Sequence, residues 1–169
     1  LFPYTTLFRS LARSLHPDIG LKWPNDLWWQ ERKLAGILIE TASVGAARQA
    51  VIGVGVNMAP PLQSEGLRTP AAGLRELVPG IDASAALLRL AAPLVRTLKT
   101  FETAGFSPFL AGYRERDLLQ GREVVLSDGV RGLAQGIDAT GALLVHTAAG
   151  LQRVTSSDVS VRPRTDATP

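Results

Sequence analysis

The sequence predicts an α+β fold in which a mixed sheet with helices is followed by a small β-barrel. Strand-like runs and helical patterns occupy the chain up to about residue 118, whereas short β-rich runs separated by glycine turns come after Gly121. Short strands at close spacing are typical of small barrels. We therefore predict a first domain over residues 11–118, a barrel over residues 119–163 and a tail over residues 164–169.

The first ten residues differ in sequence pattern from the rest of the chain. They show no apolar period, contain Pro3 and precede a helical pattern that starts abruptly at Leu11. We interpret residues 1–10 as a non-native leader, such as a cloning or sequence-assembly scar. The alternative is a genuine but irregular N-terminus.

The first half of the chain alternates apolar runs with proline and polar turns. Asn25 and Asp26 follow a proline, and short polar side chains in this position satisfy backbone groups of a turn. The predicted elements are the end of a helix from Leu11 to about Pro17, a strand over residues 19–23, a loop over residues 24–33 and two strands over residues 34–41 and 50–57.

A long loop and two helices are predicted next. Residues 58–80 are rich in proline, glycine and polar residues, and Ser84 can cap a helix that runs to about Ala104. Pro93 predicts a kink or a displaced start, since proline cannot continue the hydrogen-bond ladder. A shorter helix is predicted from Ser107 to about Asp117. The apolar stripe of the long helix comprises Leu87, Ala91, Leu94, Leu98 and Phe101.

Five short strands account for the predicted barrel. They are separated by glycine-containing turns, such as Asp128-Gly129 and Ala149-Gly150. The predicted strands cover residues 123–126, 130–137, 142–146, 151–154 and 159–162.

Composition excludes several classes of protein. Apolar residues make up 46% and charged residues 20%, which is typical of a globular chain. No run approaches the roughly 18 apolar residues of a membrane helix, and nothing resembles a secretory signal, so we expect no membrane partner. With no cysteine, disulfides, thiolate chemistry and Cys-type zinc sites are excluded, and we expect a cytoplasmic protein.

The basic isoelectric point does not indicate nucleic-acid binding. The sequence pI is 9.8, but the net charge is only +3 and the arginines are scattered rather than clustered. Phosphate binding needs a block of Lys and Arg on one element. We therefore predict no nucleic-acid partner.

The run over residues 50–58 has one almost bare face. With a period of two, Val51, Gly53, Gly55 and Asn57 share one face, while branched apolar residues share the other. Glycine inside a strand often marks the close approach of a ligand or of another backbone. Either a flat ligand lies across Gly53 and Gly55, with Asn57 bound to its polar edge, or a helix packs closely there.

Three segments together are more specific than any one alone. They read Lys22-Trp23-Pro24-Asn25-Asp26, then Arg32-Lys33-Leu34-Ala35-Gly36-Ile37-Leu38-Ile39-Glu40, then Ile52-Gly53-Val54-Gly55-Val56-Asn57. Alone, a cluster such as Glu31-Arg32-Lys33 is typical of a solvated turn. In this order and spacing the segments resemble the central motifs of biotin–protein ligases, and the resemblance extends from Leu11 to Arg162.

The resemblance implies a truncated biotin/lipoate-ligase-like sheet followed by an SH3-like barrel. It also implies a reaction: ATP activates the biotin carboxylate as biotinyl-5′-AMP, and a lysine of a biotin carboxyl carrier domain then attacks the mixed anhydride. The family's catalytic lysine falls on Lys33, at the biotin carboxyl and the α-phosphate. Asp26 matches an acidic position with an electrostatic role, with Mg²⁺, the nucleotide or the amine as partner.

The remaining site residues are implied by the same resemblance. Lys22 and Trp23 are interpreted as mainly structural, with Lys22 also a nucleotide contact. The implied substrates and ion are ATP, biotin and Mg²⁺. The biotin site comprises Lys33, Gly36, Ile37, Leu38, Gly53 and Gly55, and the nucleotide site comprises Asn57, Lys22 and Asn25.

The sequence also departs from the family pattern. It lacks the Gly/Arg-rich loop of GRGRxGR type upstream of the lysine motif, and residues 59–80 offer no aromatic to stack on adenine. We therefore expect weak or no ligase activity from this chain alone. Two alternatives stay open: a non-catalytic fragment that binds the carrier domain, and a lipoate-type ligase. Homodimerisation through the central sheet is common in the family.

Overall fold

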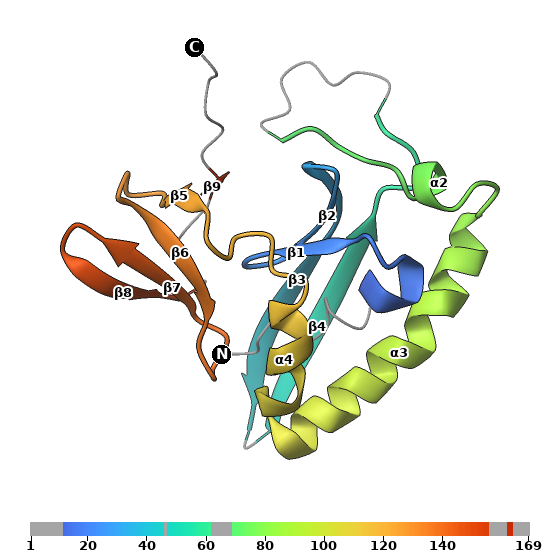
Figure 1. The fold of residues 1–169 in the computed structure, drawn as a ribbon. Coiled ribbons are helices and arrows are strands. Elements are labelled where there is room, and N and C mark those ends of the chain that lie inside the picture. Colours follow the sequence, from blue (N-terminus) through green and yellow to red (C-terminus); the bar gives the residue numbers. More distant parts are fainter. Residues whose placement is uncertain (1–11, 46, 62–68, 156–161, 164–169) are drawn as a thin grey trace, which may run out of the picture.

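The computed structural model describes residues 12–45, 47–61, 69–155 and 162–163, which form two antiparallel sheets and a long helix (Figure 1). The first sheet has the order β1-β2-β3-β4, built from β1 (Gly20–Lys22), β2 (Asp26–Trp29), β3 (Arg32–Val44) and β4 (Ala47–Val56). The second has the order β8-β7-β6-β5-β9, built from β5 (Glu123–Val125), β6 (Arg131–Ile137), β7 (Leu143–Thr147), β8 (Gly150–Val154) and β9 (Arg162–Pro163).

The α+β class is confirmed, with two corrections. The first sheet is antiparallel rather than mixed, since parallel pairing among the described residues is confined to the isolated bridges Leu21↔Asp117 and Lys33↔Ala71. The second sheet is antiparallel, but no pairing between its end strands β8 and β9 is found in the described part of the chain. A closed SH3-like barrel is therefore not confirmed. The predicted leader and tail, and most of the strand predicted over residues 159–162, lie outside the described residues.

The loop predicted over residues 24–33 is wrong in its middle, where Asp26–Trp29 form β2. This strand pairs with β1 on one side and β3 on the other, and its Leu27 and Trp28 are buried. A central strand that buries an aromatic overrides the local turn signal of Asn25 and Asp26. The turn is instead restricted to residues 23–25.

The long helix α3 (Ala83–Ala104) confirms the predicted helix but not its start. Its N-cap is Asp82, whose Oδ1 accepts a hydrogen bond from the Ala85 backbone N–H (2.7 Å), and the helix continues through Pro93. Two of the five residues of the predicted apolar stripe are exposed, because Leu87 is 66% exposed and Ala91 is also exposed. Both line an apolar groove between α3 and β4, on the same side as Val54 and Val56.

Two shorter helical segments flank α3. The long loop over residues 58–80 contains α2 (Leu74–Leu77), which the sequence did not predict because it is only one turn long. The helix predicted from Ser107 to about Asp117 begins as a 3-10 turn, η1 (Ser107–Phe109), and continues as α4 (Leu110–Arg114). None of the helices in the described ranges combines the length and apolarity needed to span a membrane.

The two sheets share one hydrophobic core. Leu21 in β1 belongs to the same buried cluster as Leu119 and Val124, which lie at the start of the second sheet. The backbone of Leu21 donates to Arg116 O (2.8 Å) and accepts from Leu118 N–H (2.9 Å). The buried Trp23 indole N–H donates to Gly141 O at 3.1 Å, in the turn that precedes β7. The segment around Trp23 is therefore fixed by the second sheet as well as by the first.

Acid should loosen the second sheet through Asp138. Burial alone would raise the pKa of this carboxyl group, but hydrogen bonds from Arg153, Thr140 and Ala142 outweigh burial and lower the pKa from 3.8 to about 2. A carboxyl group with a depressed folded-state pKa stabilises the fold above its unfolded pKa, and this stability is lost as the pH falls. We expect the Tm, measured by circular dichroism, to fall when the pH is lowered from about 4 to about 2. The fall should be smaller in the variant Asp138→Asn than in the parent chain. Equal acid slopes in the two proteins would contradict this role.

Candidate active site

Three charged residues of the Lys22–Asp26 and Lys33 motifs meet beside the β2–β3 hairpin. The Lys33 ammonium lies 2.6 Å from Asp26 Oδ1, and the Lys22 ammonium lies 3.9 Å from Asp26 Oδ2. The Asp26 side chain is only 13% exposed, whereas that of Lys33 is 41% exposed. Lys22 is buried, and its ammonium lies 5.1 Å from the centre of the Trp28 ring. The cluster therefore carries a net positive charge, with Lys33 as its solvent-facing cation.

The backbone of Lys33 is held by three hydrogen bonds. Its N–H donates to Pro70 O (2.8 Å), and its carbonyl oxygen accepts from Ala72 N–H (2.9 Å) and from the Asn57 side-chain amide (3.1 Å). A bulge between Leu27 and Trp28 shifts the register of the hairpin there. Lys33 is thus a fixed main-chain position that carries a charged side chain paired with Asp26.

Gly36 lies directly beneath the Lys33 ammonium. A Cβ atom at this position would lie 3.3 Å from Lys33 Nζ and 3.4 Å from Asp26 Oδ1. Contacts this short are tighter than those that side chains normally make, so any substituent would press on the ion pair. The glycine therefore leaves the space in which the Lys33–Asp26 pair sits.

An open hollow of about 420 Å³ lies next to this pair. Seven of its eight lining residues are predicted site residues, and Val54 is the eighth. Leu38 offers a side chain that is 58% exposed, whereas the Ile37 side chain is buried, leaving only its main chain for the hollow. The lining residues are Asn25, Lys33, Gly36, Ile37, Leu38, Gly53, Val54 and Gly55.

The face that carries Gly53 and Gly55 is open. A Cβ on Gly53 would meet only Leu38 O at 3.8 Å, and one on Gly55 would meet only Gly36 O at 4.0 Å. Both neighbours belong to the adjoining strand β3. Among the described residues, then, no helix packs against these glycines, and the bare face is free for a ligand.

The two predicted asparagines both bind the backbone of the site. The Asn25 amide N–H₂ donates to Ile37 O (3.2 Å), and Asn57 donates to Lys33 O. Asn25 lines the hollow, whereas Asn57, Lys22 and Asp26 do not. Their nucleotide contacts stay predictions, while the geometry gives each asparagine a structural role as well.

The described residues do not fit a protein-built magnesium site. Within the described part of the chain, no three His, Asp or Glu residues gather as metal ligands. Mg²⁺ is held by carboxylate oxygens, waters and phosphates, but both Asp26 oxygens face a lysine ammonium. Asp26 therefore serves as a counter-ion to lysine, and no step of the reaction is assigned to a metal at this carboxylate.

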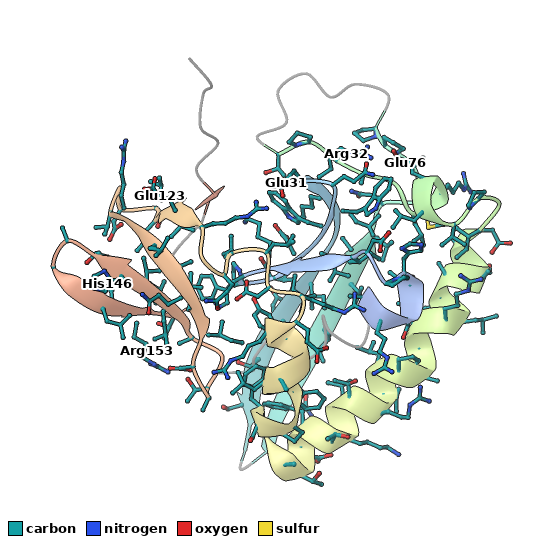
Figure 2. The ribbon with its side chains drawn as sticks, viewed as in Figure 1. Glu31, Arg32, Glu76, Glu123, His146 and Arg153 are labelled. Carbon is teal, nitrogen blue, oxygen red and sulfur yellow. The ribbon has the colours of Figure 1, made fainter. Side chains whose placement is uncertain are left out.

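The turn beside the site carries ion pairs that sequence reasoning missed. The cluster at Glu31 and Arg32 matches the pattern of a solvated turn, yet Arg32 pairs with Glu76 (2.9 Å) and Glu31 pairs with Arg122 (2.9 Å). Arg32 lies between Glu31 and Glu76 in Figure 2. Their partners are 44 and 91 residues away in the chain, so no local pattern could indicate the pairs.

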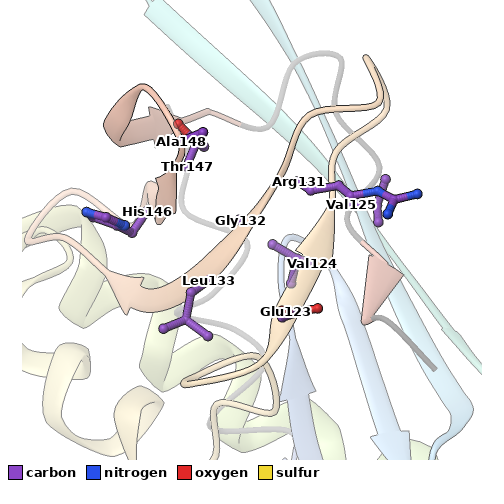
Figure 3. Close-up of a pocket in the computed structure, with 9 residues that line it drawn as sticks. All are labelled: Glu123, Val124, Val125, Arg131, Gly132, Leu133, His146, Thr147 and Ala148. Carbon is purple, nitrogen blue, oxygen red and sulfur yellow. The ribbon is translucent and has the colours of Figure 1, made fainter. Parts of the chain in front are cut away.

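A second hollow of about 520 Å³ lies on the second sheet (Figure 3). Leu133, Arg131 and His146 contribute to its walls, from β6 and β7. It contains none of the predicted site residues. It also offers a mixture of apolar walls and opposite charges that specifies no ligand class, so the first hollow is the candidate site.

Two family models match this chain. The Biotin/lipoate A/B protein ligase family matches residues 11–57, which include every predicted site residue. The Biotin protein ligase C terminal domain matches residues 120–162, which correspond to the second sheet. The two matches thus fall on the two sheets separately.

Curated relatives and solved structures agree with these models. The bifunctional ligase/repressor BirA of Escherichia coli is 36% identical over 158 residues, covering 90% of this chain and 49% of the relative. The biotin–[acetyl-CoA-carboxylase] ligase of Paracoccus denitrificans is 31% identical over 149 residues, covering 83% of this chain and 62% of the relative. The chain spans about half the length of the E. coli relative that it matches.

The fold similarity covers nearly the whole chain. The biotin protein ligase of Aquifex aeolicus superposes with a TM-score of 0.84 at 26% identity, covering 97% of this chain and 75% of that one. The same Aquifex protein in complex with biotin and ATP gives a TM-score of 0.82 at 27% identity, covering 97% and 72%. The matched motifs, relatives and fold together support this chain as a fragment of a biotin protein ligase.

Proposed function

We propose that this chain carries the substrate site of a biotin–protein ligase, which joins biotin to an acceptor lysine at the expense of ATP. The observation that carries the proposal is the position of the Lys33 ammonium, over Gly36 and at the edge of the hollow lined by Gly53 and Gly55. A carboxylate entering this hollow meets a fixed cation and a bare backbone face. That is the arrangement needed to hold two anionic reactants together.

Adenylation is the first step. A biotin carboxylate oxygen attacks the α-phosphorus of ATP, the bond to the bridging oxygen breaks, and pyrophosphate leaves with that electron pair. Negative charge gathers on the carboxylate and the α-phosphate oxygens, where Lys33 provides a preorganised positive charge. Lysine suits this role as a compact point charge on a flexible stem.

Transfer is the second step. The acceptor lysine amine attacks the acyl carbon of the mixed anhydride, AMP leaves, and the amine loses a proton as the amide forms. Asp26 holds the Lys33 ammonium in place between the two steps, and Lys22 balances the charge of Asp26. We propose a biotin carboxyl carrier domain as the acceptor and the cytoplasm as the compartment.

Biotin is favoured over lipoate by the second sheet. The model matched by residues 11–57 is named for both biotin and lipoate ligases, whereas that matched by residues 120–162 is named for biotin protein ligases. The Aquifex neighbour, which shares the fold, was solved with biotin and ATP bound. These observations support biotin and ATP as the ligands of this chain.

The substitution Gly55→Val separates ligand binding from folding. The Cβ position is open, so a valine should not disturb the sheet and adds β-propensity, yet its methyl groups fill the hollow. We expect the Tm to stay within about 2 °C or to rise, while biotin affinity falls about tenfold or more, because a filled pocket cannot admit the ring. Calorimetric titration with biotin and thermal melts provide the two measurements.

The matched control is Val51→Thr, on the same face of β4 but outside the hollow. It should bind biotin as the parent chain does. Tighter binding of lipoate than of biotin by the parent chain would contradict the proposed substrate. Unchanged biotin affinity in Gly55→Val would contradict the proposed position of the site.

A further inference from the structure

The turn between β2 and β3 has an unfavourable backbone for its residues. Gln30 and Glu31 close a two-residue hairpin with φ angles of 48° and 58°, both in the left-handed region. Turns of this kind favour Asn-Gly, because long side chains are strained there. Neither residue here is glycine or asparagine, so the Glu31 side chain occupies a strained backbone position.

The Glu31 carboxylate is held by Arg122, which directly precedes β5 of the second sheet. Arg122 donates from Nη1 to Glu31 Oε2 and from Nη2 to Glu31 Oε1, each at 2.9 Å. A bidentate contact of this kind fixes the orientation of the carboxylate as well as its distance from the guanidinium. Arg122 itself is anchored, since its N–H donates to Leu119 O and its carbonyl accepts from Ala134 N–H in β6, both at 2.9 Å.

The other side of the same turn is held by the segment around α2. Arg32 contacts the Glu76 carboxylate through two nitrogens, at 2.9 and 3.2 Å, and its guanidinium lies 5.1 Å from the Trp29 ring centre. Glu76 also accepts from Gly73 N–H at 2.6 Å. The next residue along the chain after these two anchored positions is Lys33.

We propose that Arg122 is a positioning residue for Lys33, acting through Glu31. By binding Glu31 in the turn, Arg122 sets where the β2–β3 hairpin presents the Lys33 ammonium over Gly36. The consequence for catalysis rests on the proposed ligase function, whereas the mechanical consequence for the hairpin does not.

A double-mutant cycle with reversed charges tests the coupling between Arg122 and the hairpin. The variants are Arg122→Glu, Glu31→Arg and the double variant that restores opposite charges, together with Arg122→Lys, which keeps the charge but not the fork. The control is Arg153→Glu, because Arg153 forms a 2.6 Å ion pair with Asp138 in the second sheet and is 48% exposed, against 43% for Arg122. All three positions carry exposed side chains, so the fold should survive.

The first readout is hydrogen exchange at the Lys33 amide, which is bonded to Pro70 O. We expect Arg122→Glu and Glu31→Arg each to lower its protection about fivefold, as the loss of a good exposed ion pair allows. The double variant should restore protection, and Arg153→Glu should leave it unchanged. Unaltered protection in Arg122→Glu, or no recovery in the double variant, would overturn the proposal.

The second readout is biotinyl-adenylate formation with biotin and ATP. We expect Arg122→Glu to lower kcat about fivefold with little change in the KM for biotin, because the cation is displaced while the hollow is kept, and the double variant to recover. A raised KM at constant kcat would overturn the positioning role. Failure of the parent chain to bind biotin would instead refute the proposed function, and the exchange result would stand by itself.

Discussion

The variant Lys33→Ala is expected to lose biotinyl-adenylate formation by about two to three orders of magnitude, the effect of removing one preorganised charge from a transition state. Lys33 is the solvent-facing cation of its cluster and reaches the hollow, whereas Lys22 is buried behind Asp26. Lys22 therefore cannot replace it. Without Lys33, the partly buried Asp26 would also repel both anionic reactants.

The assay measures transfer of radiolabelled AMP from ATP to biotin. Lys33→Arg keeps the charge but brings a wider planar head into the space above Gly36, so we expect strong impairment rather than rescue. Lys99→Ala is the matched control, since Lys99 is exposed on α3 and far from the hairpin in the sequence. Near-parental adenylate formation by either Lys33 variant would refute the assignment of this lysine.

The largest expected effect on stability belongs to Trp23→Ala. The Trp23 side chain is 2% exposed, packs in the common core and donates its indole N–H to Gly141 O. Truncation of a buried tryptophan costs about 3–5 kcal/mol, against about 5–15 kcal/mol for a whole domain. We expect the variant to lose much of its stability, with both sheets affected because the side chain joins them.

Trp23→Phe separates packing from the hydrogen bond. It keeps an aromatic ring but leaves Gly141 O without its donor, and we expect a loss of about 1–2 kcal/mol. Urea unfolding followed by fluorescence and by circular dichroism gives both values. The comparison residue is Trp29, which is only partly buried, so that Trp29→Phe should cost less. A smaller loss for Trp23→Ala than for Trp23→Phe would contradict the packing role of this side chain.

The spacing of the motifs predicted more of the site's residues than composition did. Lys33, Gly36, Gly53 and Gly55 are brought to one hollow, because β3 and β4 pair with Gly36 opposite Gly55 and Leu38 opposite Gly53. A period-two pattern determines which residues share a face, and an antiparallel register aligns the two faces. The glycine face of β4 could therefore be predicted from the sequence, whereas the choice between a bound ligand and a packed helix could not.

Long-range contacts explain most of what the sequence could not predict. The strand β2 depends on pairing with two neighbours, and the exposure of Leu87 and Ala91 on α3 depends on a groove whose other wall is β4. The ion pair between Arg122 and Glu31 joins residues 91 positions apart. Local periodicity contains no information about such partners, whereas the period-two alternation of β4 and the glycine turn at Asp128-Gly129 are local and could be predicted.

The Lys33–Asp26 ion pair affects the affinity of any ligand that binds in the hollow. An anion that binds the Lys33 ammonium shares it with a carboxylate 2.6 Å distant, so its measured affinity reflects the Asp26 charge as well as the Lys33 charge. A neutral amide of the same shape gains nothing from that sharing. The hollow therefore favours an anion over a neutral ligand of the same shape, while Lys22 balances the charge of the carboxylate that Lys33 shares with the ligand.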